Sequence, residues 1–182
     1  MSGTPVTEAA AAQSLAGNPH HAKSSRMNSI RIRPYDPADL TAVVELFNGS
    51  VRKIASRDYS PAQIEAWAPV AVNLIQWSER LERKPTFIAE HMNRIAGFSD
   101  LGPTGHIDML FVHCEHQGRG VAKSLMDHIL LKAHEQKLSS LCTDASITAK
   151  PFFERSGFKV AWEQDVELRG QIFRNYRMIR VL

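Results

Sequence analysis

The sequence lacks long hydrophobic runs, and it has few cysteines and little net charge. None of its apolar runs approaches the roughly 18 residues of a membrane-spanning helix, so no transmembrane segment is predicted. Its two cysteines, Cys114 and Cys142, do not make a disulfide framework and fit the reducing cytoplasm. The net charge of +3 comes from scattered Lys and Arg residues, so neither nucleic acid nor a membrane surface is predicted as a partner.

Two common nucleotide-binding motifs are also absent. The sequence contains no Gly-x-x-x-x-Gly-Lys-Ser/Thr motif, which excludes a P-loop. Lys123 stands where a third glycine would have to follow Gly118 and Gly120, which excludes the Gly-x-Gly-x-x-Gly dinucleotide fingerprint. The adjacent pair His20 and His21 has no further ligand nearby in sequence, so we interpret it as two solvated histidines and predict no metal site.

The composition predicts an N-terminal segment that differs from the rest of the chain, followed by one globular domain. The first 26 residues are small and polar, without apolar periodicity or a secretory hydrophobic region, and predict a disordered leader over 1–26. Met27 is an alternative start. The remainder, 27–182, has the length of a single domain, and the whole chain contains 43% hydrophobic and 23% charged residues, which is typical of a globular protein.

Local patterns predict alternating strands and helices. The long helix begins after Gly118 and runs to about Lys137, because its apolar residues recur every four positions. The order is a strand, three helices, a meander of strands, the long helix, a strand, a short helix and a final hairpin turning at Arg169–Gly170. The ranges before the long helix are 29–35, 36–55, 59–69, 73–84 and 86–112, and those after it are 139–145, 148–157 and 158–182. This order predicts an α/β layered domain.

The segment between the apolar run "IDMLFV" and the long helix has the pattern Gln117-x-x-Gly120-x-Ala122. The first N–H groups of a helix have no partner within the helix, and the helix dipole makes this end partly positive. Glycine allows the backbone to approach a phosphate, and Arg119 and Lys123 add charge. By itself the pattern agrees equally with an ordinary helix start after a convenient turn.

Two longer stretches carry a family resemblance. "HIDMLFVHCEHQGRGVAKSLMDHIL" resembles motif A of the GNAT superfamily of N-acetyltransferases, which bind acetyl-CoA, and "TDASITAKPFFERSGFK" is similar to its motif B. The resemblance covers roughly 29–182. The stretches "NGSVRKIASRDYSPAQIEAWAP" and "ASITAKPFFERSGF" look most like the bacterial YafP-like branch. The resemblance implies a GNAT-type three-layer α/β domain, in which helices flank a mixed, mostly antiparallel sheet.

The resemblance also implies an activity and a binding site. The protein would transfer acetyl from acetyl-CoA to a primary amine of a small molecule, peptide or protein by direct attack in a ternary complex. The strand 107–112 would splay from its neighbour and pair with the pantetheine arm, and the loop amides would hold the pyrophosphate. The implied cofactor-binding residues are Leu110, Phe111, Val112, Gln117, Gly118, Arg119, Gly120, Val121, Ala122, Lys123, Ser124, Ser146 and Phe153.

Candidate catalytic residues precede the loop or come from outside the two motifs. His106 and Asp108 lie two apart in a predicted strand and would share one face. His106 matches by spacing the glutamate base of histone-acetylating GNAT enzymes, and Asp108 would orient it or a water. A hydrogen-bonded structural pair is an equal alternative.

The resemblance places Phe153 where many GNAT enzymes have a tyrosine that protonates the CoA sulfur. Tyr59 or Tyr176 could supply this proton, or the thiolate could leave unassisted. The lost hydroxyl also favours an alternative function, namely a catalytically weak acyl-CoA-binding sensor or interaction module. The superfamily commonly dimerises, so a homodimer is a further expectation.

Overall fold

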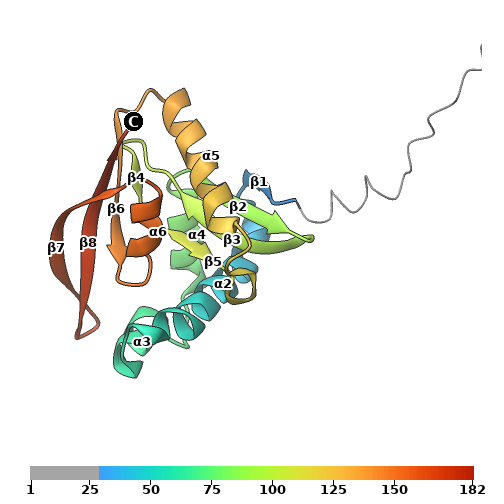
Figure 1. The fold of residues 1–182 in the computed structure, drawn as a ribbon. Helices are drawn as coiled ribbons and strands as arrows, with labels where there is room; N and C mark the ends of the chain where they lie inside the picture. The colour runs from blue at the N-terminus through green and yellow to red at the C-terminus, as the bar shows by residue number, and fades with distance from the viewer. Residues whose placement is uncertain (1–28) are drawn as a thin grey trace, which may run out of the picture.

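A computed structural model describes residues 29–182. The predicted leader over 1–26, the pair His20 and His21, and the alternative start at Met27 lie outside the described residues. The described chain forms two four-stranded sheets flanked by helices (Figure 1). The predicted mixed α/β architecture is therefore confirmed.

The first sheet has the order β1-β2-β3-β5, and all its neighbours are antiparallel. The second has the order β4-β6-β8-β7, in which only β4 and β6 are parallel. The strands of the first sheet are β1 (Arg31–Pro34), β2 (Thr86–His91), β3 (Arg94–Asp100) and β5 (Leu110–Val112). Those of the second are β4 (His106–Ile107), β6 (Ser140–Ser146), β7 (Lys159–Leu168) and β8 (Gln171–Val181).

Helices flank both sheets. They are α2 (Leu40–Lys53), α3 (Pro61–Trp67), α4 (Leu74–Glu82), α5 (Val121–Glu135) and α6 (Lys150–Arg155), with short 3-10 turns η1 (Pro37–Asp39), η2 (Ala55–Arg57) and η3 (Cys114–His116). Asp36 and Ser60 begin their segments as capping boxes followed by proline.

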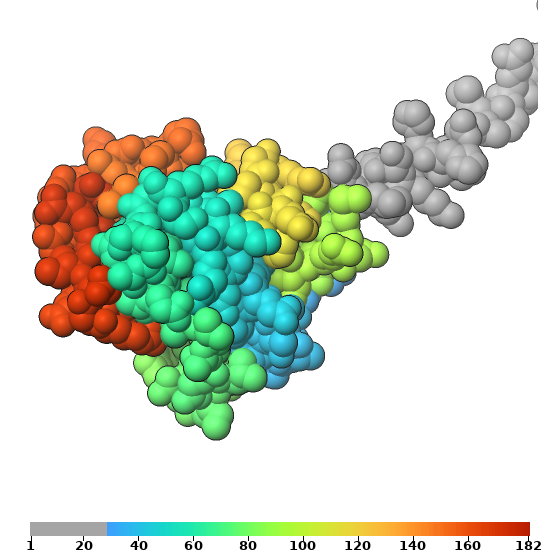
Figure 2. Space-filling model, turned by 90° about the horizontal axis from the view of Figure 1, so that it is seen from below, coloured from blue at the N-terminus to red at the C-terminus, as the bar shows by residue number. Residues whose placement is uncertain are grey.

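Two hydrophobic cores lie on opposite faces of the first sheet. Alternating residues of β2 divide between them, because successive side chains of a strand point to opposite faces. Phe87 and Ala89 join the core under α5 and α6, and Ile88 joins the core under α2, α3 and α4. In Figure 2, α2 and α3, in blue-green, lie between the red β7–β8 hairpin and the yellow segment that precedes α5.

The chain changes sheets at Asp108–Met109, between β4 and β5. The expectation of one continuous strand over 107–112 is therefore wrong, because β4 pairs with β6 whereas β5 pairs with β3. Asp100, which is fully buried, bridges the break: its Oδ1 accepts hydrogen bonds from the N–H groups of Asp108 at 2.8 Å and Met109 at 3.2 Å. Its Oδ2 lies 3.1 Å from Nζ of Lys84. A side-chain carboxylate thus replaces the missing strand partner.

The Asp100→Ala variant should lose about 3 kcal/mol or more of unfolding free energy, because two backbone N–H groups lose their acceptor. Asp100→Asn should lose less, since its amide oxygen can still accept both bonds while the ion pair with Lys84 is lost. Urea denaturation measures both. The control Glu135→Ala removes an exposed ion pair with Lys132 and should change stability by less than about 0.5 kcal/mol. Equal stabilities of Asp100→Ala and the control would contradict the bridging role.

Candidate active site

One cavity of about 1000 Å³ runs through the gap between β5 and β6. At one end it is lined by the loop before α5 and by the start of that helix. At the other end it is lined by α2, α3 and the β7–β8 hairpin. Because β5 and β6 belong to different sheets, their facing edges are not paired with each other. The backbone groups along this gap are therefore free to pair with a ligand.

Unpaired backbone N–H groups gather at the α5 end of the cavity. Within the described chain, no hydrogen bond uses the N–H groups of residues 118–123 as donors, and the first donor of the helix is Ser124, which bonds to the carbonyl of Gly120. Gly118 and Gly120 have φ values of 72° and 83°, a conformation that favours glycine. The side-chain amide of Gln117 donates to the carbonyl of Val112 at 2.9 Å and fixes the loop to β5. Such an arrangement of free N–H groups is suited to an anion.

The structure separates the predicted loop residues into two groups. Those on the cavity wall are Gln117, Gly118, Gly120, Val121, Ala122 and Lys123. Arg119 is exposed and Ser124 is half-buried, and neither side chain lies on the wall. Nζ of Lys123 lies 2.6 Å from the Asp127 carboxylate, so its charge is shared.

His116 also lies on the cavity wall, just before the loop, and sequence reasoning assigned it no role. It is 8% exposed and packs edge-to-face on His91 and His113, with ring centroids 5.3 and 5.4 Å apart. Burial, together with these neighbours, lowers the pKa of His116 below its usual value. The side chain is therefore neutral near pH 7 and adds no charge to the loop.

The middle of the cavity is bordered by the free edge of β5. Leu110, Phe111 and Val112 all lie on the wall, and their strand pairs only with β3 among the described strands. Across the gap stands Ser146, whose Oγ accepts a hydrogen bond from the N–H of Ala149 at 3.1 Å. Phe153 reaches the wall from α6, is 3% exposed and packs on Phe158, with centroids 5.2 Å apart.

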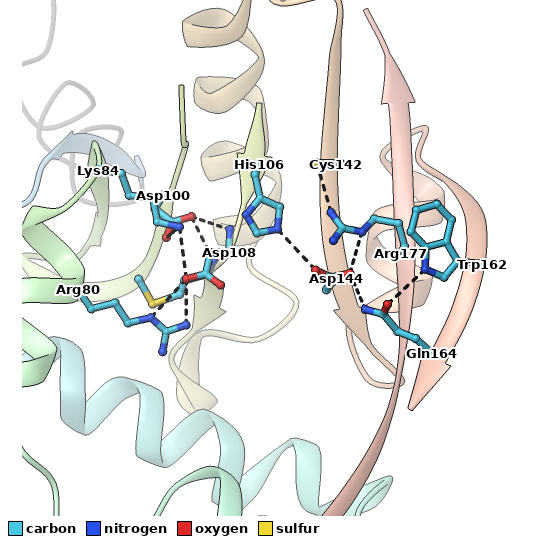
Figure 3. Close-up of polar contacts among 11 residues, drawn as sticks. Arg80, Lys84, Asp100, His106, Asp108, Cys142, Asp144, Trp162, Gln164 and Arg177 are labelled. Carbon is cyan, nitrogen blue, oxygen red and sulfur yellow. Dashed lines mark hydrogen bonds and ion pairs between the residues drawn. The ribbon is translucent and has the colours of Figure 1, made fainter. Parts of the chain in front are cut away.

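The two candidate residues His106 and Asp108 do not act on each other (Figure 3). Asp108 lies on the cavity wall, where its carboxylate is 3.0 Å from Arg80 and 3.3 Å from Lys84. Burial raises the pKa of Asp108, but the charges and hydrogen bonds of these two cations outweigh it and hold the pKa below the usual value. The expectation that Asp108 orients His106 is wrong, because the Asp108 carboxylate contacts Arg80 and Lys84 instead. That it orients a water stays a prediction.

His106 faces a different carboxylate, which sequence reasoning missed. Its Nε2 lies 3.7 Å from Oδ2 of Asp144 on β6, and its side chain is 33% exposed. His106 itself is not on the cavity wall, whereas Asp144 is. Asp144 also lies 2.9 Å from Nε of Arg177 and accepts a hydrogen bond from the amide of Gln164 at 2.9 Å.

The two candidate tyrosines have different surroundings. Tyr59 lies on the wall and is 7% exposed, and its hydroxyl accepts a hydrogen bond from the N–H of Ile147 at 3.0 Å. Burial raises the pKa of Tyr59, so this hydroxyl keeps its proton. Tyr176 packs against the core under α5 and α6, its ring 4.3 Å from Nζ of Lys150, and it is not on the wall.

Among the described residues, no group of three or more His, Cys, Asp or Glu side chains is arranged to hold a metal ion. None of the described helices is long and apolar enough to cross a bilayer.

Comparisons with known proteins agree with this geometry. Residues 55–180 match the family model for the acetyltransferase (GNAT) domain. The chain is 41% identical over 153 residues to YafP of Escherichia coli (strain K12), an uncharacterized N-acetyltransferase, covering 84% of this chain and 96% of that protein. The predicted likeness to the YafP-like branch is confirmed.

Two solved structures show the same fold. A GCN5-related N-acetyltransferase of Rhodopseudomonas palustris superposes with a TM-score of 0.81 at 34% identity, covering 86% of this chain and 98% of that one. The PaiA N-acetyltransferase of Thermoplasma acidophilum, solved in complex with coenzyme A, superposes with a TM-score of 0.69 at 17% identity, covering 85% of this chain and 99% of that one. The chain therefore belongs to the GNAT family of acetyl-CoA-dependent N-acetyltransferases.

Proposed function

We propose that this protein transfers the acetyl group of acetyl-CoA to a primary amine of a small molecule or peptide by direct attack in a ternary complex. The main support is the continuity of one cavity, which joins the free amides of residues 118–123, the open edge of β5 and an acceptor end at α3 and the β7–β8 hairpin. A donor bound along the free amides and the β5 edge would place its thioester at the acceptor end.

Each part of the donor would have a matching surface. The amides of 118–123 would bind the pyrophosphate, with Lys123 and Arg119 beside them. The backbone of Leu110–Val112 would pair with the pantetheine amides as an added strand does, opposite Ser146 and Phe153. A second hollow of about 630 Å³ shares Lys123 and Arg155 with the main cavity and contains Arg180, so its charge suits the adenosine phosphate.

The acceptor must lose a proton before it attacks, because an alkylamine with a pKa near 10.4 is protonated at neutral pH. His106 is the proposed proton acceptor. Asp108, held ionised by Arg80 and Lys84, would contribute negative charge to the cavity rather than accept a proton. Tyr59, whose hydroxyl is on the wall, would give a proton to the departing sulfur, whereas Tyr176 would support the sheet by packing.

A specific observation favours a second function. Phe153, at the position where many relatives have a tyrosine, is buried against Phe158 and has no proton to give. The thiolate of a thiol with a pKa near 8.5 can leave without receiving a proton, but transfer would then be slow. A protein with such slow transfer would serve as an acyl-CoA sensor or interaction module.

The compartment and the assembly are also part of the proposal. Cys114 and Cys142 are free thiols, which suits the cytoplasm. Along β7, which pairs only with β8 among the described strands, Trp162 and Val166 are exposed. An unpaired edge with apolar side chains is a surface that a second copy could cover.

Acetyl-CoA at about a hundred times its Kd should raise the unfolding free energy by about 2.7 kcal/mol, while ATP should have little effect. A panel of primary amines should then release free thiol from acetyl-CoA with at least one acceptor. Differential scanning fluorimetry and a colorimetric thiol assay measure the two effects. Binding without any amine-dependent thiol release would favour the sensor, and no binding would overturn both functions.

Gly120→Glu should abolish acetyl-CoA binding in calorimetry, because it places a side chain and a negative charge at the proposed pyrophosphate site. Gly170→Glu is the matched control. Gly170 has a φ of 74°, close to the 83° of Gly120, but it lies in the β7–β8 turn. Both variants therefore carry the same backbone strain and charge. An equal loss of affinity in both, or none in Gly120→Glu, would contradict the loop assignment.

A further inference from the structure

A carboxylate and an orphaned amide oxygen share one face of the second sheet at the acceptor end of the cavity. Residues directly opposite in an antiparallel pair point to the same face. Asp144 is opposite Arg177, and Asn175 is opposite both Ser146 and Gln164. Asp144, Asn175 and Ser146 all lie on the cavity wall. Oδ1 of Asn175 is buried and has no hydrogen-bond partner among the described residues.

These oxygens suit a cation that carries several N–H donors. A primary ammonium group has three donors and no acceptor, and a buried acceptor without a donor is costly unless a ligand satisfies it. Asp108, the other carboxylate on the wall, already contacts two cations, Arg80 and Lys84. Asp144 contacts one, Arg177, and therefore has more capacity for a second.

Asp144 also links the cavity to a group that can accept a proton. Nε2 of His106 is buried, lacks a hydrogen-bond partner among the described residues, and lies 3.7 Å from Oδ2 of Asp144. The side chain of His106 is 33% exposed, so the ring also reaches solvent. Asp144 thus lies on the cavity wall, and Figure 3 shows His106 beside its carboxylate.

We propose that the acceptor enters as a protonated primary amine, that Asp144 and Asn175 bind its ammonium group, and that His106 takes its proton through Asp144. This inference rests on the proposed acetyl transfer. The neutral amine then attacks the thioester carbon, the N–C bond forms, and the C–S bond breaks with its electron pair on sulfur. The nitrogen loses a second proton after the N–C bond forms; Tyr59 gives its own proton to the sulfur and takes this one in exchange, and His106 returns the first proton to solvent.

Other charged groups lie around Asp144 and His106. On the same sheet, Arg177 also lies beside Cys142. Across the strand break are Asp108 and its two cations. His106 must be neutral to accept a proton, so kcat should fall toward acidic pH.

Two amine substrates that differ in charge distinguish a loss of proton removal from a general loss of activity. Phenethylamine is protonated at neutral pH, whereas aniline is uncharged and needs no base before attack; both carry a ring that suits the aromatic wall of Trp67, Phe111 and Phe173. Asp144→Asn should lower kcat/KM for phenethylamine by about 100-fold or more, lower that for aniline far less, and keep acetyl-CoA affinity within twofold. Asp144→Glu should recover part of the lost rate.

His106→Gln, behind the cavity wall, provides a second measurement. It should lower kcat for phenethylamine and remove the fall of kcat toward acidic pH. Asp165→Asn is the matched control, since Asp165 is a carboxylate on β7 of the same sheet, 2.9 Å from Arg174, and is not on the wall. It should behave as the wild type with both nucleophiles.

The outcomes distinguish this inference from the proposed function. An active wild type whose ratio of phenethylamine to aniline rates is unchanged in Asp144→Asn overturns this inference alone. If Asp144→Asn loses acetyl-CoA affinity, the pH dependence of kcat in His106→Gln becomes the test of the inference. A pH dependence equal to that of the wild type overturns it. A wild type that binds acetyl-CoA and acetylates no amine overturns the proposed function, and this inference with it.

Discussion

The buried carboxylate of Asp100 holds the structural feature on which the site depends. It accepts the N–H groups of Asp108 and Met109, where the chain leaves one sheet and joins the other. Without that acceptor, the break would expose two polar groups to an apolar interior. Burial raises the pKa of Asp100, and the nearby charge of Lys84 opposes this effect. The gap between β5 and β6, and hence the cavity, exists because this break is stable.

The divergence of the sheets places three different chemical environments along one channel. At the start of α5 the unpaired amides of 118–123 supply positive potential without a formal charge. In the middle, the edge of β5 offers hydrogen bonds of fixed direction. At the far end, aromatic rings surround two carboxylates. A long molecule with a phosphate end, an amide arm and a reactive acyl group meets these environments in the order in which its own parts occur.

The two carboxylates of the cavity differ because of their neighbours rather than their residue type. Asp108 lies between Arg80 and Lys84, and this keeps it ionised and fully engaged. Asp144 has Arg177 on one side and His106, an imidazole that can accept a proton, on the other. The surroundings of Asp108 suit a permanently ionised carboxylate, and those of Asp144 suit a carboxylate that passes a proton on.

The sequence by itself determined the local elements and the family. Capping residues Asp36 and Ser60, the turn at Arg169–Gly170 and the glycines around Arg119 act within a few residues, so their effects can be read from neighbouring letters. Only the tertiary structure decided which groups meet. The polar alternation of β6 could have marked Asp144, but its contacts with His106 and Arg177 depend on pairing with β4 and β8, far away in the chain. The strand break likewise depends on Asp100, whose contact with Asp108 and Met109 forms only when β3 and β5 pair. Register between distant strands is set by the whole packed core, and no local pattern specifies it.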